Sequence, residues 1–197
     1  ESLHDCTVRM NPHRINMKLK NALDKASNVK ISCGREYSTD FKACKNEAEL
    51  EGMRTAHILD GVALVNFLAM VKRNEFDFTE LSISQALEDE RALEEDYLGP
   101  SFSTIAGFGD HGAVVHYSAT EETDKAIEGN GLLVLDSGGQ YTCGTTDVTR
   151  TLLFGEATKE QKEDYTLVLK GHLALCSQVF PKGTAGVQLD ILAHQFL

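Results

Sequence analysis

One segment, residues 131–151, constrains the fold of this chain more than any other. It reads GLLVLDSGGQYTCGTTDVTRT, in which the apolar run Leu132–Leu135 ends in Asp136 and a β-branched run resumes at Thr145. The tract between them, Ser137–Gly144, is rich in residues that favour turns. Two β-prone runs joined by such a tract predict an antiparallel hairpin with a long loop. The chain therefore contains a sheet built at least partly from local, antiparallel strands.

The centre of this hairpin decides which residues face each other. A centre between Tyr141 and Thr142 makes Asp136 and Asp147 cross-strand partners, with Cβ atoms about 5 Å apart. Two carboxylates at that separation repel each other, and aspartate is depleted within strands. A cation between them reverses the sign of that interaction, and bridging carboxylates suit two metal ions about 3.5–4 Å apart. The hairpin thus predicts Asp136 and Asp147 as metal ligands.

Alternation along the second strand gives these aspartates neighbours. Thr149 and Thr151 share the face of Asp147 and are placed to hydrogen-bond the ligand carboxylates. Arg150 lies on the opposite face, where a structural role is expected. The spacing alone also fits a plainer interpretation, with Asp136 as a turn residue and Asp147 as a solvent-facing strand residue. Both interpretations stay open on spacing.

His116 is the second candidate for chemistry. It follows the apolar run Ala113–Val115 and precedes Tyr117, in a segment expected to be a strand. A histidine at a strand end is either a hydrogen-bonded structural group or, near neutral pH, a proton shuttle beside a metal-bound water. His111 lies in a polar loop nearby and could face a cleft.

Several classes of protein are disfavoured. Ser137-Gly138-Gly139 lacks the lysine of a P-loop, and Ser137 does not lie in a Gly-x-Ser-x-Gly elbow. The net charge of −11 repels phosphate backbones, so nucleic acid is not an expected partner. The five scattered cysteines form no Cys-x-x-Cys pair, which favours a reducing, cytoplasmic compartment. No run reaches about 18 apolar residues, so no membrane association is expected.

Helix signals flank the hairpin. Three predicted helices begin with a polar residue followed three positions later by Glu or Gln, the capping-box pattern: Asn46 (running to about Arg73), Ser82 and Thr158. Strands are expected at Phe102–Ala106, Ala113–Tyr117, 132–136 and Thr145–Phe154. The predicted fold class is α+β, a sheet of mostly local antiparallel strands with long helices on one face.

Residues 1–44 differ from the rest. They offer one short helix, Asn16–Lys25, and one strand, Val29–Ser32, which is too little to bury a core. We interpret 1–44 as the end of a preceding domain with its linker, and 45–197 as the first part of the main domain. A last helical pattern near Val187 reaches Leu197 without a stop signal, so the natural chain is expected to continue.

Four segments resemble one family. LDSGGQYTCGTTDVTRT is similar to the first metal-ligand motif of the Xaa-Pro aminopeptidases, the aminopeptidase P branch of the pita-bread metallopeptidases. NEAELEGMRTAHILDGVALVNFL resembles the first helix of that catalytic domain, and SFSTIAGFGDHGAVVHY resembles its substrate-side segment. LVLKGHLALCSQVFPKGT resembles the helix after the second ligand. The likeness runs from about Lys45 to Leu197, and more loosely back through MNPHRIN.

The resemblance implies a fold and a set of roles. Residues 45–197 would form the first half of a pita-bread catalytic domain, preceded by the tail of an α/β domain. Asp136 would bind one metal ion in bidentate fashion, Asp147 would bridge two, and His116 would be the active-site histidine. The metals would be Mn²⁺, with Zn²⁺ or Co²⁺ as alternatives. The substrates would be peptides with proline in second position, and the intact protein would be a homodimer.

The family's ligand set is not complete within this chain. The resemblance implies two aspartates followed by a histidine and two glutamates from later strands, and only the aspartates fall before Leu197. The chain alone is therefore expected to be inactive. Two other readings stay open: a pita-bread domain that binds peptides or proteins without cleaving them, and a related dipeptidase (prolidase) or methionine aminopeptidase.

Overall fold

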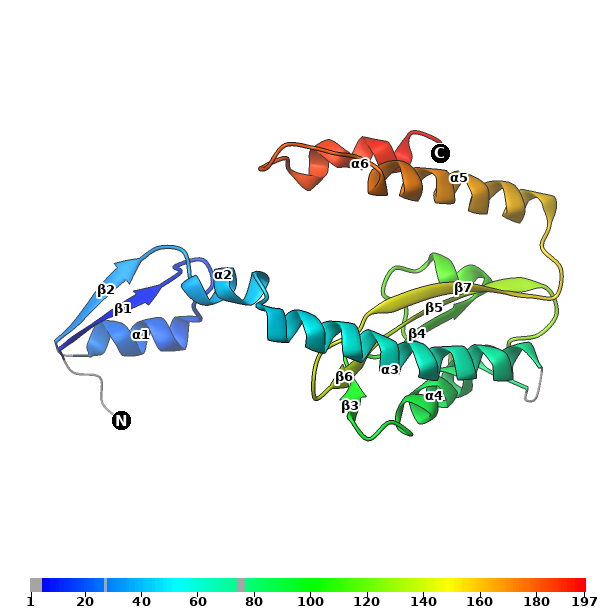
Figure 1. Cartoon of the computed structure of the whole chain (residues 1–197), viewed down its shortest axis with the longest axis horizontal. Helices are drawn as coiled ribbons and strands as arrows, with labels where there is room; N and C mark the ends of the chain where they lie inside the picture. The colour runs from blue at the N-terminus through cyan, green and yellow to red at the C-terminus, as the bar shows by residue number, and fades with distance from the viewer. Residues whose placement is uncertain (1–4, 27, 74–76) are drawn as a thin grey trace. The chain divides into compact units, whose positions relative to one another are not determined.

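The computed structural model describes residues 5–26, 28–73 and 77–197 (Figure 1). It contains two compact units, Glu1–Gly52 and Met53–Leu197. The division between units falls within helix α3 (Glu47–Lys72). The assignment of 1–44 to a preceding domain stays a prediction, and its first four residues lie outside the described part of the chain.

The first unit is a β-α-β arrangement. Strands β1 (Cys6–Met10) and β2 (Val29–Cys33) pair in parallel, and helix α1 (Met17–Lys25) connects them, as parallel neighbours require. Asn16 begins α1 by accepting a hydrogen bond from the Leu19 amide at 2.9 Å. Helix α2 (Tyr37–Ala43) follows β2. The predicted helix and strand are both present, and β1 was missed.

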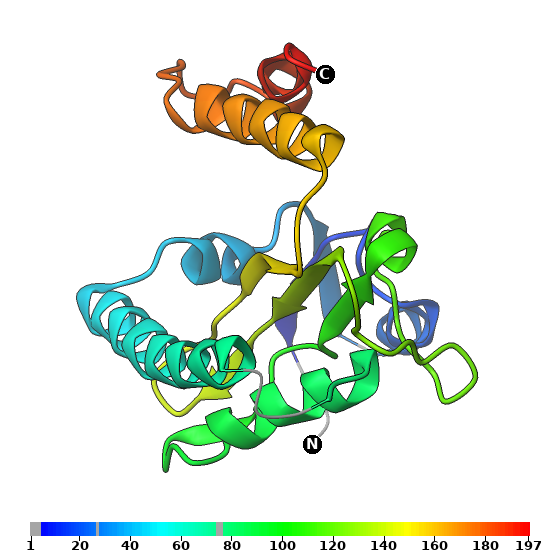
Figure 2. The ribbon, with the colours of Figure 1, turned by 90° about the vertical axis from the view of Figure 1, so that its right-hand side faces the viewer.

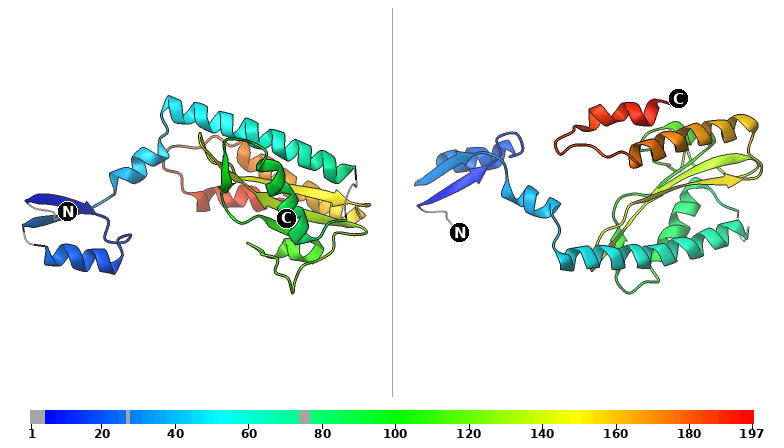
Figure 3. Two further views of the ribbon diagram at one scale, coloured as in Figure 1. Left: turned by 90° about the horizontal axis from the view of Figure 1, so that it is seen from below. Right: turned by 45° about the horizontal axis from the view of Figure 1, so that its top comes forward.

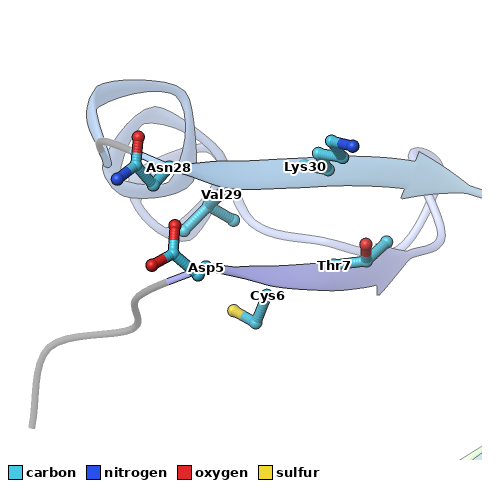
Figure 4. A pocket seen from close by; sticks show the side chains of 6 residues that line it. All are labelled: Asp5, Cys6, Thr7, Asn28, Val29 and Lys30. Carbon is cyan, nitrogen blue, oxygen red and sulfur yellow. The ribbon is translucent and has the colours of Figure 1, made fainter.

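A hollow of about 420 Å³ lies where β1 and β2 begin (Figure 4). It is lined by Asp5, Cys6, Thr7, Asn28, Val29 and Lys30. Asp5 and Asn28 adopt positive φ angles of 45° and 63°, the left-handed conformation that aspartate and asparagine tolerate best after glycine. Its side chains do not form a metal-ligand cluster among the described residues.

The second unit contains the predicted antiparallel sheet, in the order β4-β5-β7 (Figure 3). Its strands are β4 (Ile105–Phe108), β5 (Gly131–Ser137) and β7 (Val148–Phe154). Side chains of β5 alternate strictly, because Leu133, Leu135 and Ser137 are buried while Leu132, Val134 and Asp136 are only partly so. A two-stranded sheet of β3 (Tyr97–Pro100) and β6 (Gly139–Tyr141) stands beside it.

Helices α3 and α4 (Glu80–Arg91) cover the buried face of this sheet (Figure 2). The core joins Leu64 and Phe67 of α3 and Ile83 and Leu87 of α4 to apolar residues of β4 and β5, among them Phe108, Leu133 and Leu135. Fully burying one such side chain stabilises the fold by about 1.5–3 kcal/mol relative to leaving it exposed. The core therefore fixes which face of β5 points away from the helices.

Helix α3 begins as predicted. The Asn46 side chain accepts from the Glu49 amide at 2.9 Å, and the Glu49 carboxylate accepts from the Asn46 amide at 2.8 Å. By length and composition α3, with a mean hydropathy of 1.3 over one window, is also the one described helix that could cross a membrane. It packs against the sheet through Leu64 and Phe67 and carries the buried Asp60, as a core helix does.

The predicted start of α4 at Ser82 is wrong by three residues. Thr79 is the N-cap, and its hydroxyl accepts from the Ser82 amide at 3.2 Å while the Ser82 hydroxyl accepts from the Thr79 amide at 2.7 Å. Ser82 is therefore the third helical residue of the capping box. Serine takes the place that Glu or Gln usually fills, so this capping box departs from the usual sequence pattern.

The strand predicted over Ala113–Tyr117 is also wrong. A 3₁₀ helix, η1 (Gly109–Ala113), occupies its beginning, and a turn containing His116 follows. Within the predicted strand, His116 has a positive φ angle of 54°, in the left-handed region rather than the β region of a strand residue. Tertiary hydrogen bonds to Glu80, described below, hold this segment in its place despite its β-prone sequence.

Helix α5 (Lys159–Cys176) starts as predicted, with Thr158 and Gln161 forming a reciprocal capping box. It packs against α6 (Gly186–His194). Side chains of α5, including Tyr165 and Val168, line a hollow of about 700 Å³ together with Leu132 and Thr151 of the sheet. Those sheet residues belong to the face opposite Leu133, so α5 covers the other face of the sheet from α3 and α4. The prediction that the long helices all lie on one face is therefore wrong.

Candidate metal centre

Asp136 lies on β5, the central strand of the sheet, and points away from the helical core. Its neighbours across the sheet are Ile105 on β4 and Thr149 on β7. The Thr149 hydroxyl donates to Asp136 Oδ1 at 2.7 Å, so the predicted hydrogen bond to this carboxylate is present. One oxygen of Asp136 is thereby oriented, and the side chain remains partly exposed to solvent.

Asp147 is not the cross-strand partner of Asp136, and this part of the prediction is wrong. The register pairs Asp136 with Thr149 and Ser137 with Val148, and Asp147 is the residue immediately before β7. The shift is two positions, so Asp147 would keep the face of Asp136 only if the alternation of β7 extends back to it. Asp147 is exposed.

The register differs because the hairpin is centred one position later than expected. The bridge between Gln140 and Thr145 and the pair of Asp136 with Thr149 are both symmetric about the Thr142–Cys143 peptide. Strand β6 within the connection pairs with β3, a partner far away in the sequence. This outside partner decides where the chain turns, and a local pattern contains no information about it.

The residue before Asp147 is held firmly. Thr146 is 1% exposed, its amide donates to the Gly139 carbonyl at 2.9 Å, and its hydroxyl accepts from the Gly139 amide at 2.9 Å. Gly138 packs so closely that a Cβ atom there would lie 2.0 Å from the Thr146 carbonyl oxygen. The Gly-Gly pair of the motif therefore permits the two arms of the connection to approach each other.

His116 is exposed on the turn after η1. A buried carboxylate holds the residues on both sides of it. Glu80 is 0% exposed and accepts from His111 Nδ1 at 2.9 Å, from the Tyr117 hydroxyl at 3.0 Å and from the Phe108 amide at 2.7 Å. The His111 and Tyr117 rings also pack together, with centroids 4.6 Å apart. Desolvation, followed by the hydrogen bond to Glu80, raises the pKa of Tyr117 above its usual value.

A second buried carboxylate lies beneath the hairpin. Asp60 is 1% exposed and pairs with Arg91, whose Nε lies 2.6 Å from Asp60 Oδ1. The same guanidinium donates through Nη2 to Ser137 Oγ at 3.1 Å, and the Tyr141 hydroxyl donates to Asp60 Oδ1 at 2.9 Å. Burial, followed by the hydrogen bond to Asp60, raises the pKa of Tyr141 well above its usual value.

Sequence patterns missed both buried clusters. Asp60 and Arg91 are 31 residues apart, as are Glu80 and His111, so no local spacing connects them. The available signal was a charged residue inside an apolar helical stretch. Asp60 interrupts the apolar face of α3, and charged residues are almost never fully buried unless they are paired. That signal could have marked Asp60 as a residue with a partner.

The donor set suits part of a metal site. Asp136 and Asp147 offer carboxylate oxygens, the ligands preferred by hard divalent cations, and Thr149 orients one of them as outer groups do in metal sites. Within the described ranges, no cluster of three or more His, Cys, Asp or Glu side chains could hold a metal ion. Two carboxylates fit a dinuclear centre only as its first members.

The fold is that of the pita-bread metallopeptidases. The model of metallopeptidase family M24 matches residues 51–197, and the chain belongs to that family. A protein of Sordaria macrospora named "Probable Xaa-Pro aminopeptidase P" is 47% identical over 162 residues, which are 80% of this chain and 26% of the relative. A protein of the same name from Botryotinia fuckeliana is 43% identical over 188 residues, 93% of this chain and 28% of the relative.

Solved structures show the same fold. An X-prolyl aminopeptidase from Caenorhabditis elegans, described as a cytosolic enzyme with a di-nuclear active site, superposes with a TM-score of 0.82 at 34% identity. The match covers 96% of this chain and 31% of that one. An X-Pro aminopeptidase from Thermotoga maritima gives a TM-score of 0.77 at 25% identity, covering 96% and 52%. The chain thus spans well under two thirds of the length of these relatives.

Proposed function

We propose that the protein containing this chain is a dinuclear-metal aminopeptidase that removes the N-terminal residue from peptides with proline in second position. The observation that carries the proposal is the hairpin, in which Asp136 lies outside the core beside the Thr149 hydroxyl and Asp147 follows the locked residue Thr146. The names of the relatives and of the C. elegans structure support the same activity.

The residues divide the work as follows. Asp136 and Asp147 hold the metal ions together with ligands supplied by the rest of the protein, and Thr149 keeps one Asp136 oxygen oriented. Bound metal ions in such centres supply a nucleophilic water and polarise the scissile carbonyl. His116, on a turn anchored at both sides by Glu80, transfers a proton or holds the substrate peptide. Mn²⁺ is the proposed metal, with Zn²⁺ and Co²⁺ as the alternatives to assay.

Three further features belong to the proposal. The enzyme works in the cytoplasm, in line with the dispersed cysteines and with the description of the C. elegans enzyme as cytosolic. It acts as a homodimer. Its partners are peptides rather than nucleic acid, because a net charge of −11 repels phosphate backbones.

The test compares aspartate variants of the whole protein. Asp136→Asn and Asp147→Asn should each lose at least one bound Mn²⁺ per chain by mass spectrometry of metals, and should lose hydrolysis of an Xaa-Pro-Yaa tripeptide. Asp190→Asn, on the exposed surface of α6, is the matched control and should retain both. Retention of metal and activity by both hairpin variants would refute the assignment.

Substrate choice separates the related activities. The tripeptide Xaa-Pro-Yaa should be cleaved, whereas the dipeptide Xaa-Pro and a Met-Ala-Yaa peptide should not. Preference for the dipeptide would identify a prolidase-like enzyme, and preference for Met-Ala-Yaa a methionine aminopeptidase. Tight peptide binding without cleavage in the metal-loaded protein would instead identify a binding module.

A further inference from the structure

The buried cluster beneath the hairpin joins four structural elements. Asp60 comes from α3, Arg91 from α4, Ser137 from β5 and Tyr141 from β6, and their exposed fractions are 1%, 1%, 1% and 4%. Two of the four, Ser137 and Tyr141, lie within the connection between the proposed ligands Asp136 and Asp147. We infer that Asp60 and Arg91 are positioning residues, which hold this connection so that both aspartates present their carboxylates to the metal ions. The inference rests on the proposed function.

The first point of attachment is Ser137. Adjacent side chains of a strand point to opposite faces, so the hydrogen bond from Arg91 Nη2 to Ser137 Oγ on the core side directs Asp136 to the other side. A slip of one residue would turn the Asp136 carboxylate toward Leu133 and Leu135 in the core. The bond thus specifies both the register of β5 and the direction of the first ligand.

The second point of attachment is Tyr141. Its hydroxyl reaches Asp60 at 2.9 Å, and its amide donates to the Gly144 carbonyl at 2.8 Å to close the turn. The ring packs edge to face against Tyr97, with centroids 5.7 Å apart. Because the turn is fixed at Tyr141, the chain reaches Thr146 and the second ligand, Asp147, at a defined place.

An ion pair suits this task better than an apolar contact. Replacing a buried ion pair with apolar residues of similar volume is often neutral or stabilising, so the pair is not needed for stability alone. The ion pair instead fixes the orientation of its partners, because the planar guanidinium donates to Asp60 through Nε and Nη2 and to Ser137 through Nη2. Lysine has the same charge without that planar group, and so provides a test.

The experiment measures Mn²⁺ binding by the whole protein. Ser137→Ala and Arg91→Lys should each weaken Mn²⁺ binding about ten-fold, the size of effect that loss of an outer partner has in metal sites. The electron paramagnetic resonance spectrum of the Mn²⁺-loaded variants should change as well. Thr142→Ala is the matched control, because Thr142 lies in the same connection but donates outside the cluster, to Asp96 at 2.6 Å. It should bind Mn²⁺ like the wild type.

The outcomes are distinct. Ser137→Ala with wild-type affinity and spectrum overturns the inference, and so does an equal loss in Thr142→Ala. Unfolding of the metal-free variants is followed in parallel, and Ser137→Ala, which removes one oxygen atom, remains informative if Arg91→Lys does not fold. Asp136→Asn is the reference: if it too retains full Mn²⁺ binding, the proposed function fails, whereas loss in Asp136→Asn alone refutes only the role of Asp60 and Arg91.

Discussion

Among the described residues, two carboxylates, those of Asp60 and Glu80, are buried almost completely, and their surroundings differ. Asp60 faces the guanidinium of Arg91, so its cluster contains a balanced pair of charges. The Glu80 carboxylate instead accepts hydrogen bonds from a backbone amide, a tyrosine hydroxyl and the ring of His111. Each carboxylate anchors one segment of the proposed site: the hairpin of Asp136 and Asp147, called the ligand hairpin below, in the first case, and the turn of His116 in the second.

The two clusters also differ in how much of their side chains is exposed to solvent. Side chains of the Asp60–Arg91 pair are 2% exposed each, whereas His111 is 25% exposed beside a fully buried Glu80. The ligand hairpin is therefore fixed by a sealed, charge-balanced contact. The His116 turn is fixed by hydrogen bonds that extend to the surface, so it is expected to open locally at a lower free-energy cost than the hairpin.

Removal of one partner of the sealed pair should have the largest effect. Arg91→Met leaves Asp60 as an uncompensated buried charge, and such losses amount to about 3–5 kcal/mol. Urea unfolding of the metal-free whole protein, followed by circular dichroism, measures the change. The double variant Asp60→Leu/Arg91→Met should recover a large part of it. A double variant no more stable than Arg91→Met would show that the cost does not come from the unpaired charge.

The Glu80 cluster should respond more weakly. Glu80→Gln preserves the size of the side chain and keeps one acceptor oxygen. The new side-chain NH₂ group, however, faces groups that are themselves donors, so at least one hydrogen bond is lost. The free energy of unfolding should fall by about 1–3 kcal/mol. The same urea experiment gives the value, with the same kind of change at an exposed position, Glu122→Gln, as the control. A loss greater than that of Arg91→Met would reverse the order of the two clusters.

The contrast also explains which parts of the fold the sequence revealed. The starts of α3 and α5 were correct, because a capping box uses only residues three positions apart. Strand β5 was correct because an apolar run bounded by turn residues is a local signal. The segment Ala113–Tyr117 was wrong because its conformation depends on Glu80, more than thirty residues earlier.

The candidate site followed the same division. Asp136 and its contact with Thr149 could be predicted from alternation within a hairpin, although the centre of the hairpin was misplaced by one position. The true centre depends on the pairing of β6 with β3, which local patterns do not encode. The roles of Asp136, Asp147 and His116 at a metal centre stay predictions.

A smaller effect is expected from Tyr141, the hydroxyl partner of Asp60. Tyr141→Phe removes one hydrogen bond, worth about 1 kcal/mol at neutral pH. Burial and Asp60 raise the pKa of Tyr141 in the folded protein. Above about pH 10 the unfolded chain therefore loses a proton that the folded chain keeps, and stability falls as pH rises. The thermal unfolding temperature should thus fall less steeply with rising alkaline pH in Tyr141→Phe than in Tyr165→Phe, an exposed control.

The smallest effect should come from the exposed pair next to the Glu80 cluster. Lys125 contacts Asp110 on η1, and its hydrogen bond is the main cause that lowers the pKa of Asp110 below the usual value. The sign follows from linkage: stability from a carboxylate with a lowered pKa is present above its unfolded pKa and is lost as pH falls through the folded one. Lys125→Met should leave the free energy of unfolding at neutral pH nearly unchanged, since exposed ion pairs contribute little. It should also make the decline of that free energy below about pH 5 less steep.

Lys159→Met, which breaks another exposed pair on α5, is the control. If Lys125→Met instead destabilised the protein as much as Glu80→Gln, the pair of Lys125 and Asp110 would act energetically as part of the buried Glu80 cluster. Asp110 would then belong to the sealed contacts rather than to the solvent-facing ones.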